Sequence, residues 1–138
     1  MLRGGCFCGF VRYVAVGVPF NESNCHCSIC RRSSGAPFLA WFTVPLDGFT
    51  VVSGEPASFA SSADGERTFC PRCGTPLTFR DRRLADEIDV TLCSLEDPAA
   101  LSPRDHTFVS SKLPWVKLAD GLPVFPYARP PQGSPSNP

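Results

Sequence analysis

A cysteine pair in the middle of the chain, Phe69-Cys70-Pro71-Arg72-Cys73-Gly74, sets the architecture that the rest of the sequence must fit. Two cysteines three positions apart on a tight turn can aim both sulfurs at one metal ion about 2.3 Å away. Gly74 suits such a knuckle, because glycine tolerates the left-handed backbone that the turn requires. Two more clusters precede it in the chain, Gly5-Cys6-Phe7-Cys8-Gly9 and Cys25-His26-Cys27-Ser28-Ile29-Cys30.

The cysteine content is the unusual number in the composition, with eight Cys in 138 residues. The first residues, Met1-Leu2-Arg3-Gly4-Gly5, show no apolar signal segment, so we expect a cytoplasmic protein with reduced thiols. Clustered cysteines in that compartment are typical of metal sites rather than of disulfides. The sequence therefore predicts zinc ions held by cysteine.

The charge balance excludes two classes of partner. Lys and Arg number 13, and Asp and Glu also number 13, so the formal net charge is zero. A non-specific nucleic-acid binder or a polybasic membrane binder needs a basic surplus. A membrane-spanning helix needs about 18 consecutive apolar residues, and the sequence has no apolar run of that length. We therefore expect neither a nucleic acid nor a membrane as partner.

Strand patterns dominate the chain, and 15 Pro and 11 Gly argue against long helices. We expect strands near residues 10–18, 38–44, 49–53, 58–62, 67–69, 75–80, 88–92 and 106–110, with helical turns near 27–33 and 97–101. Residues 127–138 are rich in Pro, Ser and Gly and are expected to form a flexible tail. The prediction is an all-β zinc-binding domain over residues 1–126, pinned by metal because its core is small.

The clustered cysteines divide into a closed set and an open set. Two knuckles make a complete tetrahedral site, so Cys6 and Cys8 are paired with Cys70 and Cys73 as ligands of a structural zinc. The remaining cluster, Cys25, Cys27 and Cys30, supplies three ligands and leaves a position for water or substrate. The sequence thus predicts two zinc ions, one structural and one at an active site.

Two residues compete for that open position. Cys93 would close the second site, although it is also explained as a small residue of a strand. His26 lies between two ligands, so its side chain is expected to point away from the metal. Either residue as a fourth ligand would make the second site purely structural.

Three thiolates give the open site a soft, electron-rich character. They outweigh the charge of a divalent zinc ion, which makes the ion a weak generator of hydroxide. A soft site prefers another sulfur, and it can lower the pKa of a bound thiol. The inferred partner is a small-molecule thiol or thiol adduct. Arg31 could meet a carboxylate of that substrate, or it could belong to a solvated basic pair.

The same three clusters resemble those of the glutathione-dependent formaldehyde-activating enzyme family, which includes centromere protein V. The resemblance extends to Leu95-Glu96-Asp97-Pro98, Pro103-Arg104-Asp105-His106, Pro114-Trp115 and Asp120-Gly121-Leu122-Pro123. It implies a β-tent fold of stacked antiparallel sheets and the same division of the two zinc sites. It also implies a carbon–sulfur lyase activity, the addition of glutathione to formaldehyde to give S-hydroxymethylglutathione. A non-catalytic carrier of thiol adducts, or a zinc-stabilised interaction module, is the alternative function.

Four more residues are candidates for the site, each with a plainer explanation. Trp41 could wall a substrate pocket or pack in the core. Ser61 could bond a peptide-like ligand or end a strand, and Arg67 could contact an anion or form an ion pair. His106 is the best candidate for catalytic proton transfer, although it could instead make structural hydrogen bonds.

Overall fold

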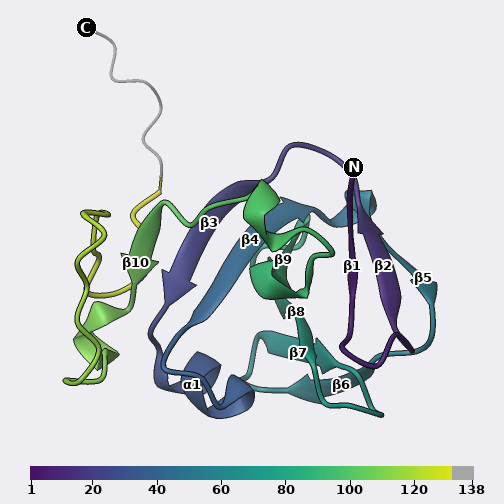
Figure 1. The fold of residues 1–138 in the computed structure, drawn as a ribbon, viewed down its shortest axis with the longest axis horizontal. Helices are drawn as coiled ribbons and strands as arrows, with labels where there is room; N and C mark the ends of the chain where they lie inside the picture. The colour runs from purple at the N-terminus through teal and green to yellow at the C-terminus, as the bar shows by residue number, and fades with distance from the viewer. Residues whose placement is uncertain (132–138) are drawn as a thin grey trace, which may run out of the picture.

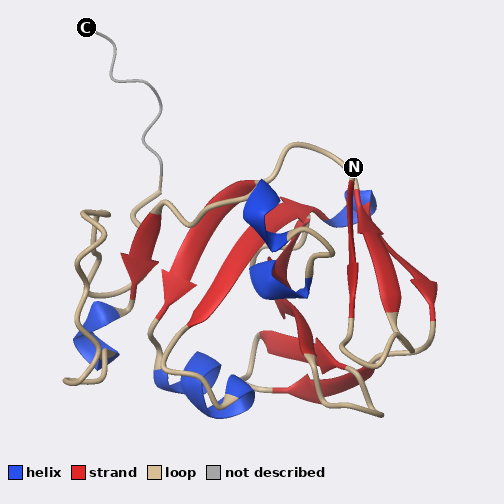
Figure 2. Ribbon diagram, in the orientation of Figure 1, coloured by secondary structure: helices blue, strands red, loops and turns tan. Residues whose placement is uncertain are grey.

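The computed structural model describes residues 1–131 and is dominated by β-strands (Figure 2). The strands are β1 (Leu2–Gly5), β2 (Arg12–Ala15), β3 (Phe20–Cys25), β4 (Leu39–Pro45), β5 (Phe49–Ser53), β6 (Ala57–Ala60), β7 (Gly65–Phe69), β8 (Pro76–Asp81), β9 (Glu87–Thr91) and β10 (Asp105–Thr107). The helix α1 (Ser28–Ser34) follows β3, and short 3-10 turns cover Leu46–Gly48, Leu92–Ser94, Pro98–Ala100 and Val109–Ser111. The predicted all-β class is confirmed.

The strands form two sheets that lean on each other (Figure 1). The smaller sheet has the order β1-β2-β5, and the larger has the order β10-β3-β4-β9-β8-β7-β6. Neighbouring strands are antiparallel except at one edge, where β10 runs parallel to β3. This two-sheet arrangement agrees with the architecture that the family resemblance implies.

The hydrophobic core lies between the two sheets. Alternating residues of β2, β4 and β9 point into it, because successive side chains of a strand face opposite sides of the sheet. Phe42, Val44 and Val90 are fully buried, and Tyr13 places its hydroxyl 2.7 Å from the Ser94 hydroxyl. Along residues 1–131, no helix has the length and apolar character that crossing a membrane requires.

Some strands differ from those expected from the sequence. The strand expected over residues 10–18 is restricted to β2, and β1 was not expected at all. β3 was missed because its sequence, Phe-Asn-Glu-Ser-Asn-Cys, lacks the apolar alternation of a half-buried strand. Its polar residues Glu22, Ser23 and Asn24 are nevertheless buried. Ser23 is also hydrogen-bonded to Thr107 across the pairing with β10. Polar contacts between distant segments therefore replace apolar packing at this edge.

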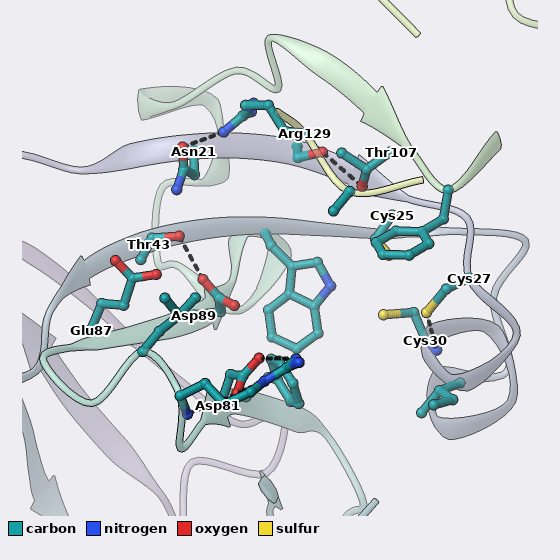
Figure 3. A pocket seen from close by; sticks show the side chains of 18 of the residues that line it. Asn21, Cys25, Cys27, Cys30, Thr43, Asp81, Glu87, Asp89, Thr107 and Arg129 are labelled. Carbon is teal, nitrogen blue, oxygen red and sulfur yellow. Dashed lines mark hydrogen bonds and ion pairs between the residues drawn. The ribbon is translucent and has the colours of Figure 1, made fainter. Parts of the chain in front are cut away.

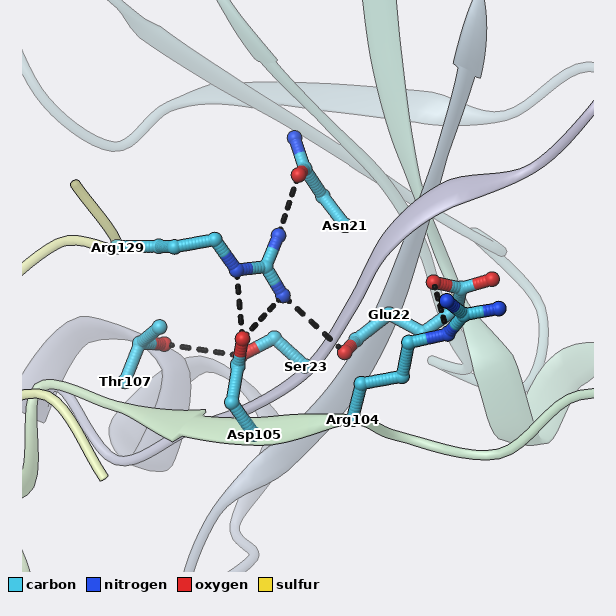
Figure 4. A network of polar contacts seen from close by, with 7 residues as sticks. All are labelled: Asn21, Glu22, Ser23, Arg104, Asp105, Thr107 and Arg129. Carbon is cyan, nitrogen blue, oxygen red and sulfur yellow. Dashed lines mark hydrogen bonds and ion pairs between the residues drawn. The ribbon is translucent and has the colours of Figure 1, made fainter. Parts of the chain in front are cut away.

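The segment after β10 folds back beside it through a network centred on Arg129 (Figure 4). The Arg129 guanidinium donates to the Asp105 carboxylate at 2.5 Å, to the Asn21 side chain and to the Glu22 carbonyl. The Phe108 amide also donates to the carbonyl of residue 127 at 3.0 Å. The boundary between a domain of residues 1–126 and a tail of residues 127–138 stays a prediction, and residues 132–138 lie outside the described residues.

Phe42 offers a direct test of this core. Replacing it in Phe42→Ala should lower the free energy of unfolding by about 3 to 5 kcal/mol, because the fully buried ring leaves a cavity. Phe59→Ala is the control, since that ring is 63% exposed and its loss should cost under about 1 kcal/mol. Urea titration followed by circular dichroism measures both values. If both variants lose the same free energy of unfolding, Phe42 is not part of the hydrophobic core.

Candidate metal centres

The first candidate centre joins the two sheets through four cysteines. The sulfurs of Cys6, Cys8, Cys70 and Cys73 all lie within 4.8 Å of one another. Cys6 and Cys70 are buried and belong to the hydrophobic core, whereas Cys8 and Cys73 are exposed. The sequence predicted this grouping from spacing alone, and the structure brings the four sulfurs together.

Both halves of this quartet have the same local geometry. The amide of Gly9 donates to the Cys6 carbonyl at 3.1 Å, and the amide of Gly74 donates to the Cys70 carbonyl at 2.9 Å. Both glycines adopt left-handed backbone, with φ of 81° and 80°, where a Cβ would be strained. Amides also point at the sulfurs, as when Arg72 donates to the Cys70 sulfur at 3.4 Å. Such N–H donors favour thiolates, which is the form that binds metal.

The second candidate centre is built where β3 passes into α1. Cys25 ends the strand, Cys27 caps the helix, and Cys30 lies buried in the first helical turn. The Cys27 sulfur accepts a hydrogen bond from the Cys30 amide at 3.2 Å. The three sulfurs lie within 4.8 Å of one another, and no other metal-binding side chain of residues 1–131 joins the group.

The donor set of this triplet fits a soft divalent cation. Hydrogen bonding to Cys27 and Cys30, together with burial, raises the pKa of the Cys25 thiol. The Cys27 thiol, by contrast, has a lowered pKa, first because of its hydrogen bond to Cys25. Three crowded sulfurs thus resist ionising together unless a cation neutralises them. Both cysteine groups are compatible with zinc, which prefers thiolate ligands.

The triplet opens onto a cavity of about 580 Å³, in contrast to the quartet. Figure 3 shows the Cys27 and Cys30 sulfurs at one side of this cavity and the Glu87 and Asp89 carboxylates at the other. The indole of Trp41, from β4, also lines the cavity. A molecule in this space could therefore reach the triplet directly.

Arg67 is the cation nearest the triplet among the contacts described. Its Nη2 lies 3.5 Å from the Cys30 sulfur, and its Nε donates to the Ser61 hydroxyl at 3.3 Å. The guanidinium is held over the rings of Trp41 and Phe79, at 5.7 Å and 4.8 Å from their centroids. Three of the residues that the sequence nominated for substrate binding, Trp41, Ser61 and Arg67, thus meet in one wall.

His26 points away from the triplet and begins a buried chain of hydrogen bonds. Its Nε2 lies 2.9 Å from His106 Nδ1, and His106 Nε2 lies 2.7 Å from the Asp120 carboxylate. Burial lowers the pKa of His26 to about 4, so its imidazole is neutral at pH 7. A carboxylate only accepts, so a neutral His106 carries its proton on Nε2 and accepts from His26 through Nδ1. The chain ties the loop of Cys25 and Cys27 to the segment around residue 120.

Other predicted site residues lie outside the cavity. His106 is 1% exposed and lies behind His26, so the cavity does not reach it. The Arg31 Nε donates to the His26 carbonyl at 3.4 Å rather than lining the cavity. Cys93 is exposed in a 3-10 turn instead of on a strand, and neither it nor His26 joins the triplet.

Sequence reasoning missed several residues of the site. Asp89 alternates with the buried Val90 on β9, and that alternation was the available signal. Asp120 stands in the quoted Asp-Gly-Leu-Pro motif, but its contact with His106 depends on how the last segment folds back. Phe79 and Glu87 also line the cavity, but nothing in the sequence distinguished them from other strand residues.

The fold and these two cysteine groups define a β-rich protein with two candidate metal centres, one of four sulfurs and one of three sulfurs that opens onto a cavity. The model of the glutathione-dependent formaldehyde-activating enzyme family matches residues 1–111. The chain belongs to that family. The match includes both cysteine groups and the residues of the cavity wall around Arg67, but ends before Asp120.

Individual relatives agree with this assignment. A protein of Halomonas elongata, named provisionally as a glutathione-dependent formaldehyde-activating enzyme, is 29% identical in an alignment 130 positions long. That alignment covers 86% of this chain and 81% of that protein. An uncharacterized lyase of Schizosaccharomyces pombe is 34% identical over 77 residues, 56% of each chain. The crystal structure of a Rhodobacter sphaeroides protein, a structural genomics target, is similar with a TM-score of 0.59 and 28% identity, over 75% of this chain and 93% of that one.

The two centres should respond differently to loss of a ligand. Cys73→Ser should remove the metal of the quartet and destabilise the fold by about 5 kcal/mol or more, because closed zinc sites contribute directly to folding. Cys27→Ser should remove the metal of the triplet and leave the fold largely intact. Elemental analysis and thermal denaturation of both variants provide the measurement. If Cys27→Ser unfolds the chain as badly as Cys73→Ser, the triplet is a purely structural site.

The hydrogen-bond chain behind the triplet can be tested at its exposed end. Asp120→Ala should weaken metal binding at the triplet about tenfold, because His106 and His26 lose the contact that orients them. The nitrogen chemical shifts of His106 should also show that its tautomer is no longer fixed. Asp47→Ala, which removes an exposed carboxylate, is the control. Unchanged affinity and unchanged shifts in Asp120→Ala would contradict the role of the chain.

Proposed function

We propose that this chain is a zinc-dependent carbon–sulfur lyase-type enzyme that acts on glutathione or a related thiol adduct, of the S-hydroxymethylglutathione synthase type. The observation that carries the proposal is a triplet of sulfurs that opens onto a cavity lined by Arg67. The family assignment and the names of the Halomonas and Schizosaccharomyces relatives support the same class of chemistry. We also expect a cytoplasmic, reducing location, in which cysteines stay reduced and available as metal ligands.

In this proposal the two cysteine groups have separate duties. Cys6, Cys8, Cys70 and Cys73 hold a structural zinc between the two sheets. Zinc bound by Cys25, Cys27 and Cys30 would offer its remaining position to a thiol sulfur and lower the pKa of that thiol. The open cavity beside the triplet supports the difference, since the quartet already has four sulfurs.

Arg67 stabilises the negative charge that gathers at the triplet. Its Nη2 donates toward the Cys30 sulfur, and its stacking on Trp41 and Phe79 fixes the guanidinium before the substrate arrives. A cation held in place in a partly dry cavity stabilises a developing anion more strongly than a mobile one. Arg31 donates to the His26 carbonyl outside the cavity, so in this proposal it does not contact the substrate.

The reaction forms one bond between the thiol sulfur and the formaldehyde carbon. The π electrons of the carbonyl move to its oxygen, and the proton lost by the thiol ends on that oxygen, so the product is a hydroxymethyl thioether. Ser61 accepts from Arg67 Nε, which leaves its own O–H free to donate to the same oxygen. His106 positions His26 in this scheme and does not meet the substrate.

Turnover by the zinc-loaded protein tests the proposal. Formation of S-hydroxymethylglutathione from glutathione and formaldehyde, followed by exchange NMR, should be faster than the spontaneous reaction. Arg67→Gln should lower the catalysed rate by at least about tenfold, because the fixed cation is lost. Arg32→Gln, which removes an exposed cation from α1, should leave the rate unchanged.

The same experiment separates an enzyme from a carrier. A non-catalytic carrier of thiol adducts would bind S-hydroxymethylglutathione and leave the rate of its formation at the spontaneous value. Tight binding of S-hydroxymethylglutathione without acceleration of its formation would therefore show that the protein is a carrier and not an enzyme.

A further inference from the structure

The cavity beside the triplet carries charges of both signs at its far end. Asp89 and Glu87 line this end, and within the described residues neither carboxylate has an ion-pair partner. Asp89 accepts one hydrogen bond, from the Thr43 hydroxyl at 2.5 Å. Arg83 also lines the cavity and is largely exposed, although it pairs with Asp81 at 2.7 Å.

The strand register gives the offset, measured along β4, between the backbone positions of Cys25 and Asp89. Cys25 is paired with Leu39 on β4, whereas Asp89 is paired with Thr43, four residues further along the same strand. At about 3.3 Å per residue, this separation is about 13 Å. Trp41, which lines the cavity, lies between these two positions on β4.

Electrostatics limits what the far end can accept. Burial raises the pKa of Asp89 to about 6, although the Thr43 hydrogen bond and the charge of Arg67 oppose the shift. Asp89 is therefore mainly ionised at pH 7, and within the described residues it forms no ion pair. Burial also raises the pKa of Glu87. Asp89 and Glu87 are half-buried, and a half-buried carboxylate without an ion pair is destabilising, so a cationic group is the ligand that relieves the cost. A lone carboxylate of a substrate would instead be repelled.

We propose that the far end of the cavity binds the α-amino-acid head group of the thiol substrate, with its ammonium at Asp89 and Glu87 and its carboxylate toward Arg83. This inference rests on the proposed function, because it assumes that the substrate sulfur lies at Cys25, Cys27 and Cys30. It assigns the selection of the substrate to residues that take no part in the chemistry at sulfur.

The offset between Cys25 and Asp89 determines how many covalent bonds must separate the amino group of the substrate from its sulfur. In a γ-glutamyl thiol, eight covalent bonds separate the sulfur from the amino nitrogen, or about 10 Å when extended. A hydrogen bond of about 2.8 Å brings the reach to about 13 Å, the separation along β4. In a thiol whose cysteine carries the free amino group, three bonds separate the two atoms, which is too short. The site therefore favours γ-glutamyl thiols over cysteine and cysteinylglycine, whose ammonium does not reach Asp89 while the sulfur lies at the triplet.

Titration of the cobalt-loaded protein tests this inference without turnover. Glutathione and γ-glutamylcysteine should change the cobalt–sulfur absorption with similar affinity. Cysteinylglycine and glutathione acetylated on its amino group should bind about tenfold more weakly or worse, because they leave Asp89 without an ammonium. If the acetylated and free forms bind equally well, the head-group site is wrong.

Variants of the carboxylates give the matched comparison. Asp89→Asn should weaken glutathione at least about tenfold and leave cysteinylglycine unchanged, and the amide can still accept from Thr43. Glu87→Gln repeats the test at the second carboxylate if Asp89→Asn does not fold. Asp86→Asn, an exposed neighbour outside the cavity, should have no effect.

The outcomes distinguish the two proposals. If no thiol changes the cobalt absorption, the proposed function fails, and the head-group site fails with it. If thiols change the absorption but Asp89→Asn, Glu87→Gln and acetylation make no difference, the proposed function stands and only the head-group site is overturned.

Discussion

Four sulfurs that converge from two knuckles are the contact on which this architecture depends. Cys6 belongs to the turn after β1 and Cys70 to the turn after β7, and both are also core residues. The quartet therefore fixes the small sheet against the large one at the edge of a modest core. Small domains need such a cross-link, because the area they bury stabilises them only marginally. The far part of the large sheet, with β3, β4 and α1, is then available to form a cavity.

The two cysteine groups use the same type of ligand in two different surroundings. The quartet has amide donors and a closed set of sulfurs, so nothing else needs to approach it. The triplet has three sulfurs, a cation at Arg67 and an aromatic wall at Trp41, and it faces open space. In the proposed function, the number of sulfurs and the surrounding shape, rather than the metal itself, would separate a structural role from a chemical one.

The sequence predicted local features well and distant contacts poorly. Cysteine spacing was enough to predict both groups, because a knuckle is built from neighbouring residues. The apolar alternation of residues 88–92 predicted β9. The polar strand β3 was not predicted, because it is stabilised by pairing with β4 and β10, which lie later in the chain. Trp41, Ser61 and Arg67 were nominated singly, but their meeting in one wall depends on sheet order. Asp120 was missed as a partner of His106 for the same reason.

The parallel pairing of β10 with β3 bears on the order in which the molecule is assembled. Thr107 lies beside Cys25, so the strand that presents the triplet gains its outer neighbour only after most of the polypeptide has been synthesised. Contacts between segments so far apart close long loops and slow folding. During translation the quartet knuckles emerge before β10 does, and the small sheet can dock early. The half of the molecule that carries the triplet is thus completed last, against a small sheet that has already folded.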